Sequence, residues 1–492
     1  MTLIDTLRAE CEQLGDELVG TPLAADVATV RARLDEPIRI AVAGRVKAGK
    51  STLVNALVGE RLAATDAGEC TLIPTWYRHG PSYKVTAIHR DGQTTELAFS
   101  REGGRLDIDL GGLAVDDIER IEVEWPADSL KDAILVDTPG LASLNDETSM
   151  RTRELLGLGQ DRASEADAVL YCLRHLHKTD AEYLGGFMDH SVAGASAANA
   201  VAILTRADEL GAGRPDALQS AARIAARYAT DPRVAAMCTA VVTLAGLLAE
   251  TGRTLTESEA ATIRELAAQT DDELAAQLIS VDRFAKGTES VPTEQREALM
   301  DRLGIYGVRI AVNDARRAIA RGRRPTAADL GQHLIEQSGI LGLNRAVEED
   351  FVPQTESLKS RSALVGLRAI AHRVAEIDQA LSDRQLGRLE RLEAGAIDLL
   401  AQRLRFLLDS GEVRLTEMQQ LRAEAMVRDE PIRSRLGLLP DADTAAVEER
   451  ARRTVELWRE QSGGGLLDPL TAETIDGLVR IAESLHHSIA SS

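Results

Sequence analysis

The sequence has no apolar run long enough to cross a bilayer. The longest run, AAMCTAVVTLAGLLA, covers residues 235–249 and is rich in alanine, whereas a membrane-spanning helix needs about 20 residues. The N-terminal stretch MTLIDTLRAECEQL mixes acidic and apolar residues at helical spacing, unlike the basic and apolar regions of a signal peptide. Both absences predict a cytoplasmic location.

Cysteine is also scarce. The four cysteines lie far apart and form no CxxC pair: Cys11, Cys70, Cys172 and Cys238. This spacing is typical of neither a zinc site nor a redox pair. We therefore expect reduced, mostly buried thiols.

The chain is short of basic residues as well. Its net charge is −21, and only seven of its residues are lysines. This balance argues against nucleic acid as the main partner, because phosphate backbones bind basic surfaces. Residues 355–492 carry 19 basic and 23 acidic side chains, so this C-terminal part is the least repelled by an anionic surface.

Two of the seven lysines lie in the octapeptide GRVKAGKS, residues 44–51. The octapeptide matches G-x-x-x-x-G-K-S, with the apolar run IRIAVA before it and the helical pattern TLVNALVG after it. A strand, a glycine loop and a helix in this order form a P-loop, whose backbone N–H groups point at phosphate oxygens.

The P-loop gives most of the expected nucleotide-binding residues. Lys50 is expected to reach the β- and γ-phosphates, and the hydroxyl of Ser51 to bind Mg²⁺. The remaining residues expected to line the phosphates are Gly44, Lys47, Ala48, Gly49 and Thr52.

Two further motifs follow apolar runs downstream. Asp137 begins DTPG at the end of AILV, where its carboxylate is expected to hold the Mg²⁺ shell and Gly140 to offer its N–H to the γ-phosphate. Thr205, Arg206 and Asp208 belong to TRAD, at the end of AVAIL.

The TRAD motif resembles the N/T-K-x-D element by which GTPases select guanine. Asp208 would accept hydrogen bonds from guanine N1 and N2, which adenine cannot donate. Arg206 replaces the usual lysine, and its guanidinium would lie over the base. Residues 243–246 follow another apolar run and form the expected fifth element.

A switch threonine completes the predicted site. Thr71, in GECTLIPT, lies between the P-loop and Asp137, where a hydroxyl would bind Mg²⁺; Thr75 is the alternative. The predicted metal ligands are therefore Ser51, Thr71 and Asp137, and the predicted substrate is GTP.

Short apolar or alternating runs predict an α/β sheet covered on both faces. The runs are IRIAVA, YKVTAIHR, IERIEVEW, AILVD, AVLYCL, AVAILT and AVVTL. IERIEVEW alternates and is followed by Pro126, which predicts an antiparallel edge strand.

Helical patterns precede and follow this sheet. Residues 1–34 place leucines at three- and four-residue steps, strands vanish after about residue 250, and leucine rows near a 3.5-residue spacing begin after 355. We expect N-terminal helices over 1–36 that pack with a neck, a nucleotide-binding head over 37–250, a helical extension and neck over 251–354, and a trunk over 355–492 whose last helix returns to the neck.

The motifs together resemble those of bacterial dynamin-like proteins. The resemblance rests on KAGKSTLVNALVG, the TLIP segment from Thr71 to Pro74, DTPG and TRAD, and extends more weakly to SGILGLNRAVEEDF and ESLKSRSALVGLRAI. It implies a GTPase with an α/β head, a helical neck and a trunk whose tip contacts lipid. It also implies pairing through the heads, with a related dynamin-like protein as a further partner, and a peripheral position on the inner face of an anionic membrane.

One departure concerns catalysis. In eukaryotic dynamins, a glutamine and a serine of the P-loop place the attacking water and a monovalent cation; here Val46 and Lys47 stand there. Leu141, after DTPG, cannot act like the glutamine of small GTPases. We expect slow basal turnover served by Lys50, Thr71 and Lys47, whose ammonium would replace the cation or else point to solvent.

The membrane contact is harder to place. The basic run of residues 316–325 ends in a glycine and proline helix stop, which favours a structural role as a helix C-terminal cap. Loops at 382–391 and 436–440 are the candidate lipid tips. The alternative function is a soluble GTPase switch acting on protein partners.

Overall fold

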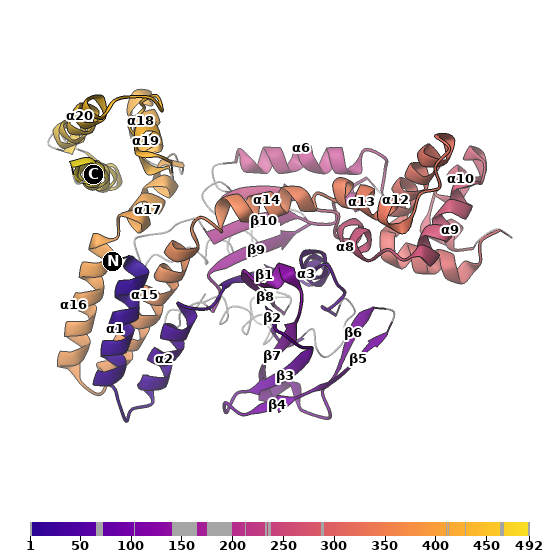
Figure 1. Cartoon of the computed structure of the whole chain (residues 1–492), viewed down its shortest axis with the longest axis horizontal. Coiled ribbons are helices and arrows are strands. Elements are labelled where there is room, and N and C mark those ends of the chain that lie inside the picture. The colour runs from indigo at the N-terminus through magenta and orange to yellow at the C-terminus, as the bar shows by residue number, and fades with distance from the viewer. Residues whose placement is uncertain are drawn as a thin grey trace.

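The computed structural model describes most of the chain (Figure 1). The described residues are 2–64, 72–102, 104–139, 165–174, 199–211, 213–231, 234, 238–286, 290–409, 411, 413–428, 430–462 and 467–490.

A nine-stranded mixed sheet forms the centre of the head, in the order β11-β10-β9-β1-β8-β2-β7-β3-β4. The five strands from β11 to β8 run parallel, and β2 turns the direction by pairing antiparallel with β8. The strands are β1 (Ile38–Gly44), β2 (Thr75–His79), β3 (Lys84–His89), β4 (Thr94–Glu96), β7 (Ile118–Trp125), β8 (Ala133–Asp137), β9 (Ala168–Leu173), β10 (Ala200–Leu204) and β11 (Ala240–Thr243). A separate hairpin joins β5 (Ala98–Glu102) to β6 (Arg105–Asp109).

Every run expected to be a strand is one, but the expected place of IERIEVEW is wrong. This segment is β7, which pairs parallel with β2 and antiparallel with β3 and so lies inside the sheet. The edge is formed instead by β4, a short strand of three exposed residues. Buried residues alternate with half-buried or exposed ones along most of β7, so an inner strand with one less buried face has the same alternating pattern as an edge strand.

Helices cover both faces of the sheet. One face packs on α3 (Lys50–Val58) and α14 (Ile340–Asp350), through Leu53, Val54 and Ile340. The other face packs on α6 (Ala217–Ala229), through Ala221. The head is therefore an α/β layered structure, as expected.

A helical extension continues from the head (Figure 1, right). It consists of α8 (Gly246–Thr254), α9 (Glu257–Ala267), α10 (Asp271–Gln277), α11 (Val281–Ala285), α12 (Thr293–Ala320) and α13 (Ala327–Ser338). Its apolar core also includes Ala217 and Ala245 of the head, so the extension packs on the head. The chain then returns to the sheet through α14.

The N-terminal helices α1 (Leu3–Glu17) and α2 (Leu23–Arg33) form a bundle with α15 (Thr355–Val374) and α16 (Gln379–Gly395). Figure 1 shows this bundle at the side of the sheet opposite the extension. Arg33 pairs with Asp167 at 3.1 Å, and the Lys359 ammonium donates to the backbone oxygen of Glu36 at 2.6 Å. These contacts join the bundle to the head.

The bundle overturns one candidate lipid tip. Residues 382–391 lie within α16, where Ser382 and Leu389 are buried and Arg388 pairs with Glu10 and Glu17. Arg384, Arg388 and Arg391, the basic residues that made this segment a candidate, lie at four- and three-residue steps on one face of a helix rather than in a loop.

The remaining helices form a distal lobe with its own apolar core. They are α17 (Ile397–Asp409), α18 (Glu417–Val427), α19 (Ile432–Arg435), α20 (Thr444–Ser462) and α21 (Pro469–Ala490). The apolar face of α21 packs in this lobe, through Ile475, Leu478 and Ile481. Arg480 of the same helix donates to the backbone oxygen of Ala394 at the end of α16, so the last helix also reaches the end of the bundle. Within the described ranges, no helix is both long and apolar enough to span a membrane.

Candidate nucleotide-binding site

The loop between β1 and α3 has the backbone that a phosphate-binding turn requires. Gly44 has a φ of 144°, and a Cβ there would lie 2.4 Å from the backbone oxygen of Cys172 on the neighbouring strand. Gly49 has a φ of 89° and caps the start of α3. Both positions lie in the part of conformational space that glycine occupies readily.

Lys50 is the first residue of α3, and its side chain is only 9% exposed. Its ammonium donates to the backbone oxygen of Arg45 at 3.4 Å, a long hydrogen bond. Burial lowers the pKa of Lys50, and the nearby Asp137 carboxylate partly offsets this. A buried ammonium that has one weak acceptor within the described part of the chain is suited to an anionic ligand.

Ser51 and Asp137 meet at the carboxyl end of the parallel strands. The Ser51 hydroxyl donates to Oδ2 of Asp137 at 2.8 Å. Oδ1 of Asp137 is buried and has no hydrogen-bond partner among the described residues. Desolvation raises the pKa of Asp137 to about 6, against the opposing effects of Lys50 and Ser51. A hydroxyl and a carboxylate oxygen without a partner fit a hard cation such as Mg²⁺.

The TRAD motif lies beside the P-loop. The Thr205 hydroxyl donates to the backbone oxygen of Leu173 at 3.1 Å, and a Cβ at Gly49 would lie 3.7 Å from Thr205 Cβ. Asp208 is 6% exposed, and burial raises its pKa to about 6. Arg206 has a φ of 51° and pairs with Glu209 at 2.6 Å.

The fifth element closes the same end of the sheet. The backbone oxygen of Leu244 accepts a hydrogen bond from Ala207 N at 3.2 Å. A Cβ at Gly246 would lie 3.1 Å from Cγ2 of Thr52 in α3. The structure thus brings the P-loop, Asp137, TRAD and residues 243–246 to one edge, although they are widely separated in sequence.

The remaining predicted site residues are not part of this cluster in the described structure. Thr71 and Gly140 lie outside the described residues. Thr75, the alternative to Thr71, begins β2 opposite Asp137, and its hydroxyl donates to Ile73 O at 3.3 Å. Lys47 is exposed with a φ of 61°, and Val46 is also exposed.

The structure adds neighbours that no motif reveals. Gly304 breaks α12 with a φ of 61° and a ψ of 173°, and a Cβ there would lie 3.9 Å from Oδ2 of Asp208. Burial and the charge of Asp208 raise the pKa of Tyr306. A single glycine in a helical pattern marks a break or a close approach, but nothing in the sequence connects it with Asp208.

A P-loop at the end of a central parallel strand, an acidic residue on the adjacent strand and a TRAD motif beyond them define a P-loop protein of the GTPase class. A family model described as "Dynamin family" matches residues 40–180. The isoniazid-induced protein IniC of Mycobacterium tuberculosis is 37% identical over 470 residues, which cover 93% of this chain and 91% of IniC.

Two further relatives match over the head. The bacterial dynamin-like protein of Nostoc punctiforme is 33% identical over 28% of this chain and 20% of its own length. The isoniazid-induced protein IniA of M. tuberculosis is 32% identical over 28% of this chain and 22% of its own length. A solved structure of an oligomerised bacterial dynamin pair covers 99% of this chain and 79% of its own, with a TM-score of 0.31 and 14% identity. The chain belongs to the bacterial dynamin-like proteins, and as a member of the dynamin family it is a GTP hydrolase.

Proposed function

We propose that this GTPase binds GTP with Mg²⁺ at the edge of the sheet described above, pairs through its head, and acts at the cytoplasmic face of a membrane. The observation that carries the nucleotide site is the Ser51–Asp137 hydrogen bond of 2.8 Å, with Oδ1 of Asp137 left without a partner in the described chain.

The P-loop residues would hold the phosphates. Gly44 and Gly49 turn the backbone, the N–H groups of Gly49 and the first turn of α3 would donate to phosphate oxygens, and Lys50 would neutralise them. Ala48, also expected to line the phosphates, donates its N–H to the backbone oxygen of Arg45 at 3.1 Å. Ser51 and Asp137 would hold Mg²⁺ together with Thr71. Mg²⁺ supplies charge neutralisation on the β- and γ-phosphates.

The base would be held at the end of β10, on the opposite side of the P-loop from Asp137. Asp208 accepts from guanine N1 and N2, Arg206 extends over the base, and Thr205 fixes the strand end beside Gly49. Glu209 supports this arrangement because it pairs with both Arg206 and Arg174, each at 2.6 Å.

Turnover is proposed to be slow without a partner. Val46 carries no group that could orient water, and the exposed Lys47 is the only cationic side chain of the loop 45–49 besides Arg45. A second head packed over the nucleotide would exclude water and complete the site. The second head would belong to another copy of this chain or to a related dynamin-like protein.

The packing of the helices suggests how the parts divide. We assign β1–β11 with α3, α6 and α14 to the head, α8–α13 to an extension that packs on it, and the α1, α2, α15 and α16 bundle to the neck. The expected boundary between a head over 37–250 and an extension over 251–354 therefore falls within α8, and α14 passes from the extension to the head. The distal lobe, α17–α21, would then be the trunk. Residues 1–36 keep their expected place in the neck, and the neck also takes residues 355–395 from the expected trunk.

The remaining candidate for lipid contact, residues 436–440, lies in the loop between α19 and α20, which covers residues 436–443. Leu439 is 73% exposed there, and the neighbouring Arg433 is exposed while its Nε donates to Ala442 O at 3.0 Å. An apolar side chain beside a fixed arginine suits an anionic bilayer surface, where each arginine contributes about 1 kcal/mol.

GTP turnover with and without anionic liposomes tests the proposal, with Lys50→Ala as the blank. Stimulated turnover together with co-sedimentation would support membrane action. Unchanged turnover without co-sedimentation would support the alternative, a soluble GTPase switch whose helices bind a protein partner.

A further inference from the structure

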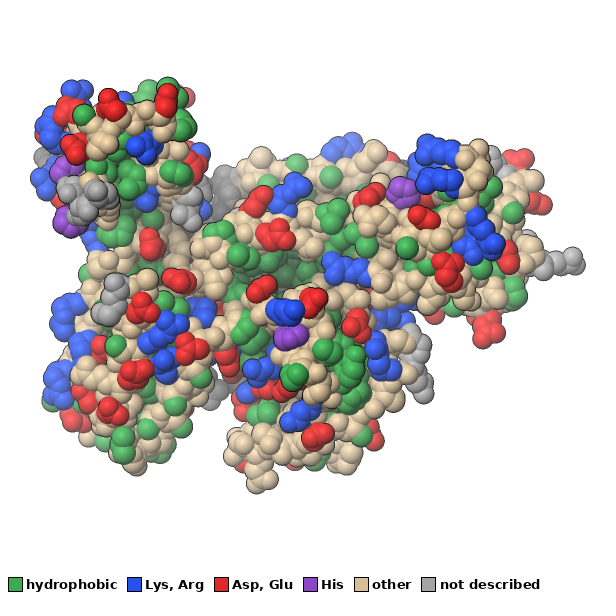
Figure 2. All heavy atoms as spheres, viewed as in Figure 1, with side chains coloured by type: hydrophobic (Ala, Val, Ile, Leu, Met, Phe, Trp, Pro, Cys, Tyr) green, Lys and Arg blue, Asp and Glu red, His purple; other side chains and the backbone are tan. Residues whose placement is uncertain are grey.

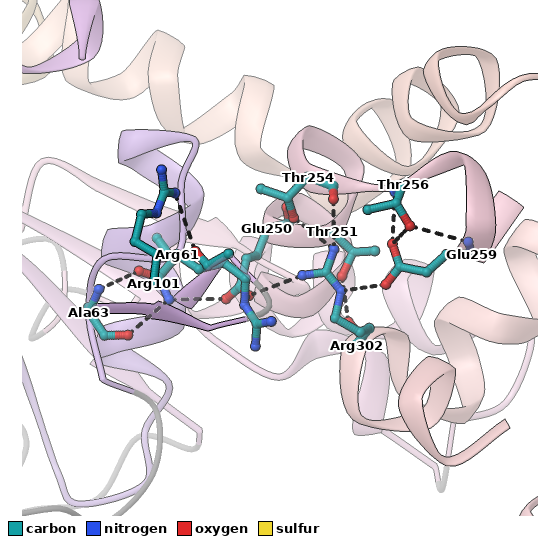
Figure 3. A network of polar contacts seen from close by, with 11 residues as sticks. Arg61, Ala63, Arg101, Glu250, Thr251, Thr254, Thr256, Glu259 and Arg302 are labelled. Atoms are coloured by element: carbon teal, nitrogen blue, oxygen red, sulfur yellow. Dashed lines mark hydrogen bonds and ion pairs between the residues drawn. The ribbon is translucent and has the colours of Figure 1, made fainter. Parts of the chain in front are cut away.

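A buried carboxylate joins the head to the helical extension (Figure 3). Glu250, on α8, is only 3% exposed. Its carboxylate oxygens lie 2.8 Å from Arg61 Nε, 3.3 Å from Asn55 Nδ2 and 4.0 Å from Arg302 Nη1. These three partners come from the segment after α3, from α3 itself and from α12.

On the head side, the network fixes the segment that follows the P-loop helix. The Asn55 side chain accepts from Ala63 N at 2.7 Å and donates to Ala63 O at 3.1 Å. Arg61 forms a bridge with Arg105, since its backbone oxygen accepts from Leu106 N at 2.9 Å. Residues 61–63 are thus held from several directions on the chain's path from the P-loop helix towards Thr71.

On the extension side, Arg302 ties α12 to α8 and α9. Its guanidinium pairs with Glu259 at 3.1 Å and donates to the Thr254 hydroxyl at 2.8 Å. Its backbone oxygen accepts from the Thr251 hydroxyl at 2.6 Å. Glu259 also caps α9 by accepting from Thr256 N at 2.8 Å, so Figure 3 shows one continuous set of polar contacts from α3 to α9.

Arg302 also belongs to the turn of α12 that lies near Asp208, the residue proposed to bind guanine. Gly304, two residues further along α12, is the break that approaches Asp208. The same turn of α12 therefore approaches the candidate guanine-binding carboxylate and is linked to residues 61–63 through Glu250.

The buried charges of this network favour one relative placement of the helices that carry them. A buried carboxylate that loses one cationic partner keeps its desolvation cost without the compensating attraction. The ion pairs of Glu250 with Arg61 and Arg302 are therefore kept only when α3, α8 and α12 keep one relative placement, and a shift of one of these helices disturbs the others.

We propose that Glu250 and Arg302 are positioning residues for GTP hydrolysis, through which the helical extension fixes residues 61–63 and thereby sets the rate of turnover. This inference rests on the GTPase activity and on the site proposed above. It assigns the extension a regulatory role: a ligand or partner that moved α12 would change kcat without touching GTP.

Two variants test the proposal in the full-length protein. Glu250→Gln keeps the shape and removes the charge, and Arg302→Lys keeps the charge and removes the fork that bridges Glu250, Glu259 and Thr254. Both are expected to lower kcat roughly three- to tenfold, a size typical of coupling through a packed network. The KM for GTP and the Kd for GDP should stay within about twofold of wild type, because neither side chain touches the nucleotide.

Arg316→Ala is the matched control. Arg316 is also an α12 arginine that binds α9, through the backbone oxygens of Ala267 at 3.1 Å and Gln269 at 2.5 Å, but it lies outside the network. It should lower the Tm and leave kcat unchanged.

Unchanged kcat in both test variants would overturn the proposal. So would an equal loss of kcat in Arg316→Ala, since the effect would then come from the packing of the extension. Wild-type protein without turnover, or with turnover that survives Lys50→Ala, would instead contradict the nucleotide site itself, and the two failures are thus distinguishable.

Discussion

The Ser51 hydroxyl donates to Asp137 Oδ2 across 2.8 Å, although the two residues are 86 positions apart in the chain. Parallel pairing of β1 with β8 brings them together, because it sets Val42 opposite Asp137. The contact joins the start of the P-loop helix to the end of the adjacent strand, and both residues have oxygen atoms suited to a hard cation.

We predict that Ser51→Ala weakens Mg²⁺-dependent nucleotide binding. The variant loses one proposed metal ligand, so Mg²⁺ affinity should fall by at least the roughly 10- to 100-fold seen when a metal site loses a supporting contact. The Kd for GDP should therefore rise in Mg²⁺ but match wild type in EDTA. Titration with a fluorescent GDP analogue measures both. Equal affinities in Mg²⁺ would show that Ser51 does not bind the metal.

The raised pKa of Asp208 predicts a pH dependence of guanine binding. Guanine N1 and N2 donate, so they need the ionised carboxylate. Because the pKa of Asp208 is about 6, GDP affinity should be constant above about pH 7 and fall about tenfold per unit well below 6. The measurement is GDP affinity against pH, in EDTA.

Asp208→Asn serves as the control for that titration. The pKa of Asp137 is also about 6, but without metal its protonation removes a negative charge near the phosphates, so it favours GDP at low pH. The variant should bind GDP weakly, lose the acid decline and keep only this opposite trend. It should also bind xanthosine diphosphate better than GDP, since the amide can donate to xanthine O2. An acid decline that survives in Asp208→Asn would rule out Asp208 as its cause.

Gly44 predicts a large stability cost for a single methyl group. A Cβ at Gly44 would lie 2.4 Å from the backbone oxygen of Cys172, so Gly44→Ala forces β1 and β9 apart. We expect a loss of about 2–5 kcal/mol, from backbone strain and overpacking together. Gly92 is the matched control: its φ is 84° and no described atom lies within 4 Å of a Cβ there. Gly92→Ala should cost about 1–2 kcal/mol from strain alone. Urea unfolding measures the loss of stability in each variant, and the difference between the two gives the contribution of the clash with Cys172. Equal losses would show that the clash does not contribute.

The exposed Lys47 predicts turnover that does not need potassium. If its ammonium replaces the monovalent cation, exchanging K⁺ for Na⁺ should leave wild-type kcat unchanged. Lys47 has a φ of 61°, which asparagine tolerates better than most residues, so Lys47→Asn removes the charge without straining the loop. This variant should be slower in Na⁺ and partly restored by K⁺. Strict potassium dependence of the wild-type enzyme would contradict this role.

The head was largely predictable because its signals are local. The P-loop, DTPG and TRAD each follow an apolar strand directly, and parallel strands bring such ends to one edge. β2 could not be predicted as readily, because TWYRH contains only five residues, two of them basic. The break at Gly304 and its approach to Asp208 depend on how α12 packs, which no local pattern gives.

Features that depend on contacts between distant parts of the chain could not be predicted from the sequence. The leucine rows of α1, α2, α15 and α16 resemble those of the distal lobe, so periodicity alone could not show which helices share a core. Glu250 lies in the apolar segment GLLAETG, and its partner Asn55 is 195 positions away. The role of a buried charged residue can be inferred only when the residues that pair with it are known.

Two apolar residues that are exposed to a similar extent, at opposite parts of the helical region, can be compared to locate the membrane contact. Leu439, 73% exposed, lies in the α19–α20 loop of the distal lobe, and Val19, 76% exposed, lies between α1 and α2 at the free end of the bundle. The Leu439 loop has Arg433 and Arg435 before it and the exposed Asp441 and Asp443 within it, and Figure 2 shows acidic and basic side chains mixed over the distal lobe. Val19 has only acidic residues just before it, Asp16 and Glu17, of which Glu17 pairs with Arg388 at 3.1 Å. An anionic bilayer should therefore accept Leu439 more readily than Val19.

We predict that Leu439→Asp abolishes most co-sedimentation with anionic liposomes, because it replaces an insertable side chain with a charge that the surface repels. Val19→Asp should leave binding unchanged. Basal GTP turnover without liposomes should be equal in both variants and in wild type, since neither position is near the nucleotide site. Loss of binding in Val19→Asp alone would move the contact to the free end of the neck bundle. Full binding by both variants would exclude either loop as the lipid tip and leave the basic turn after α12, residues 321–324, as the next surface to change.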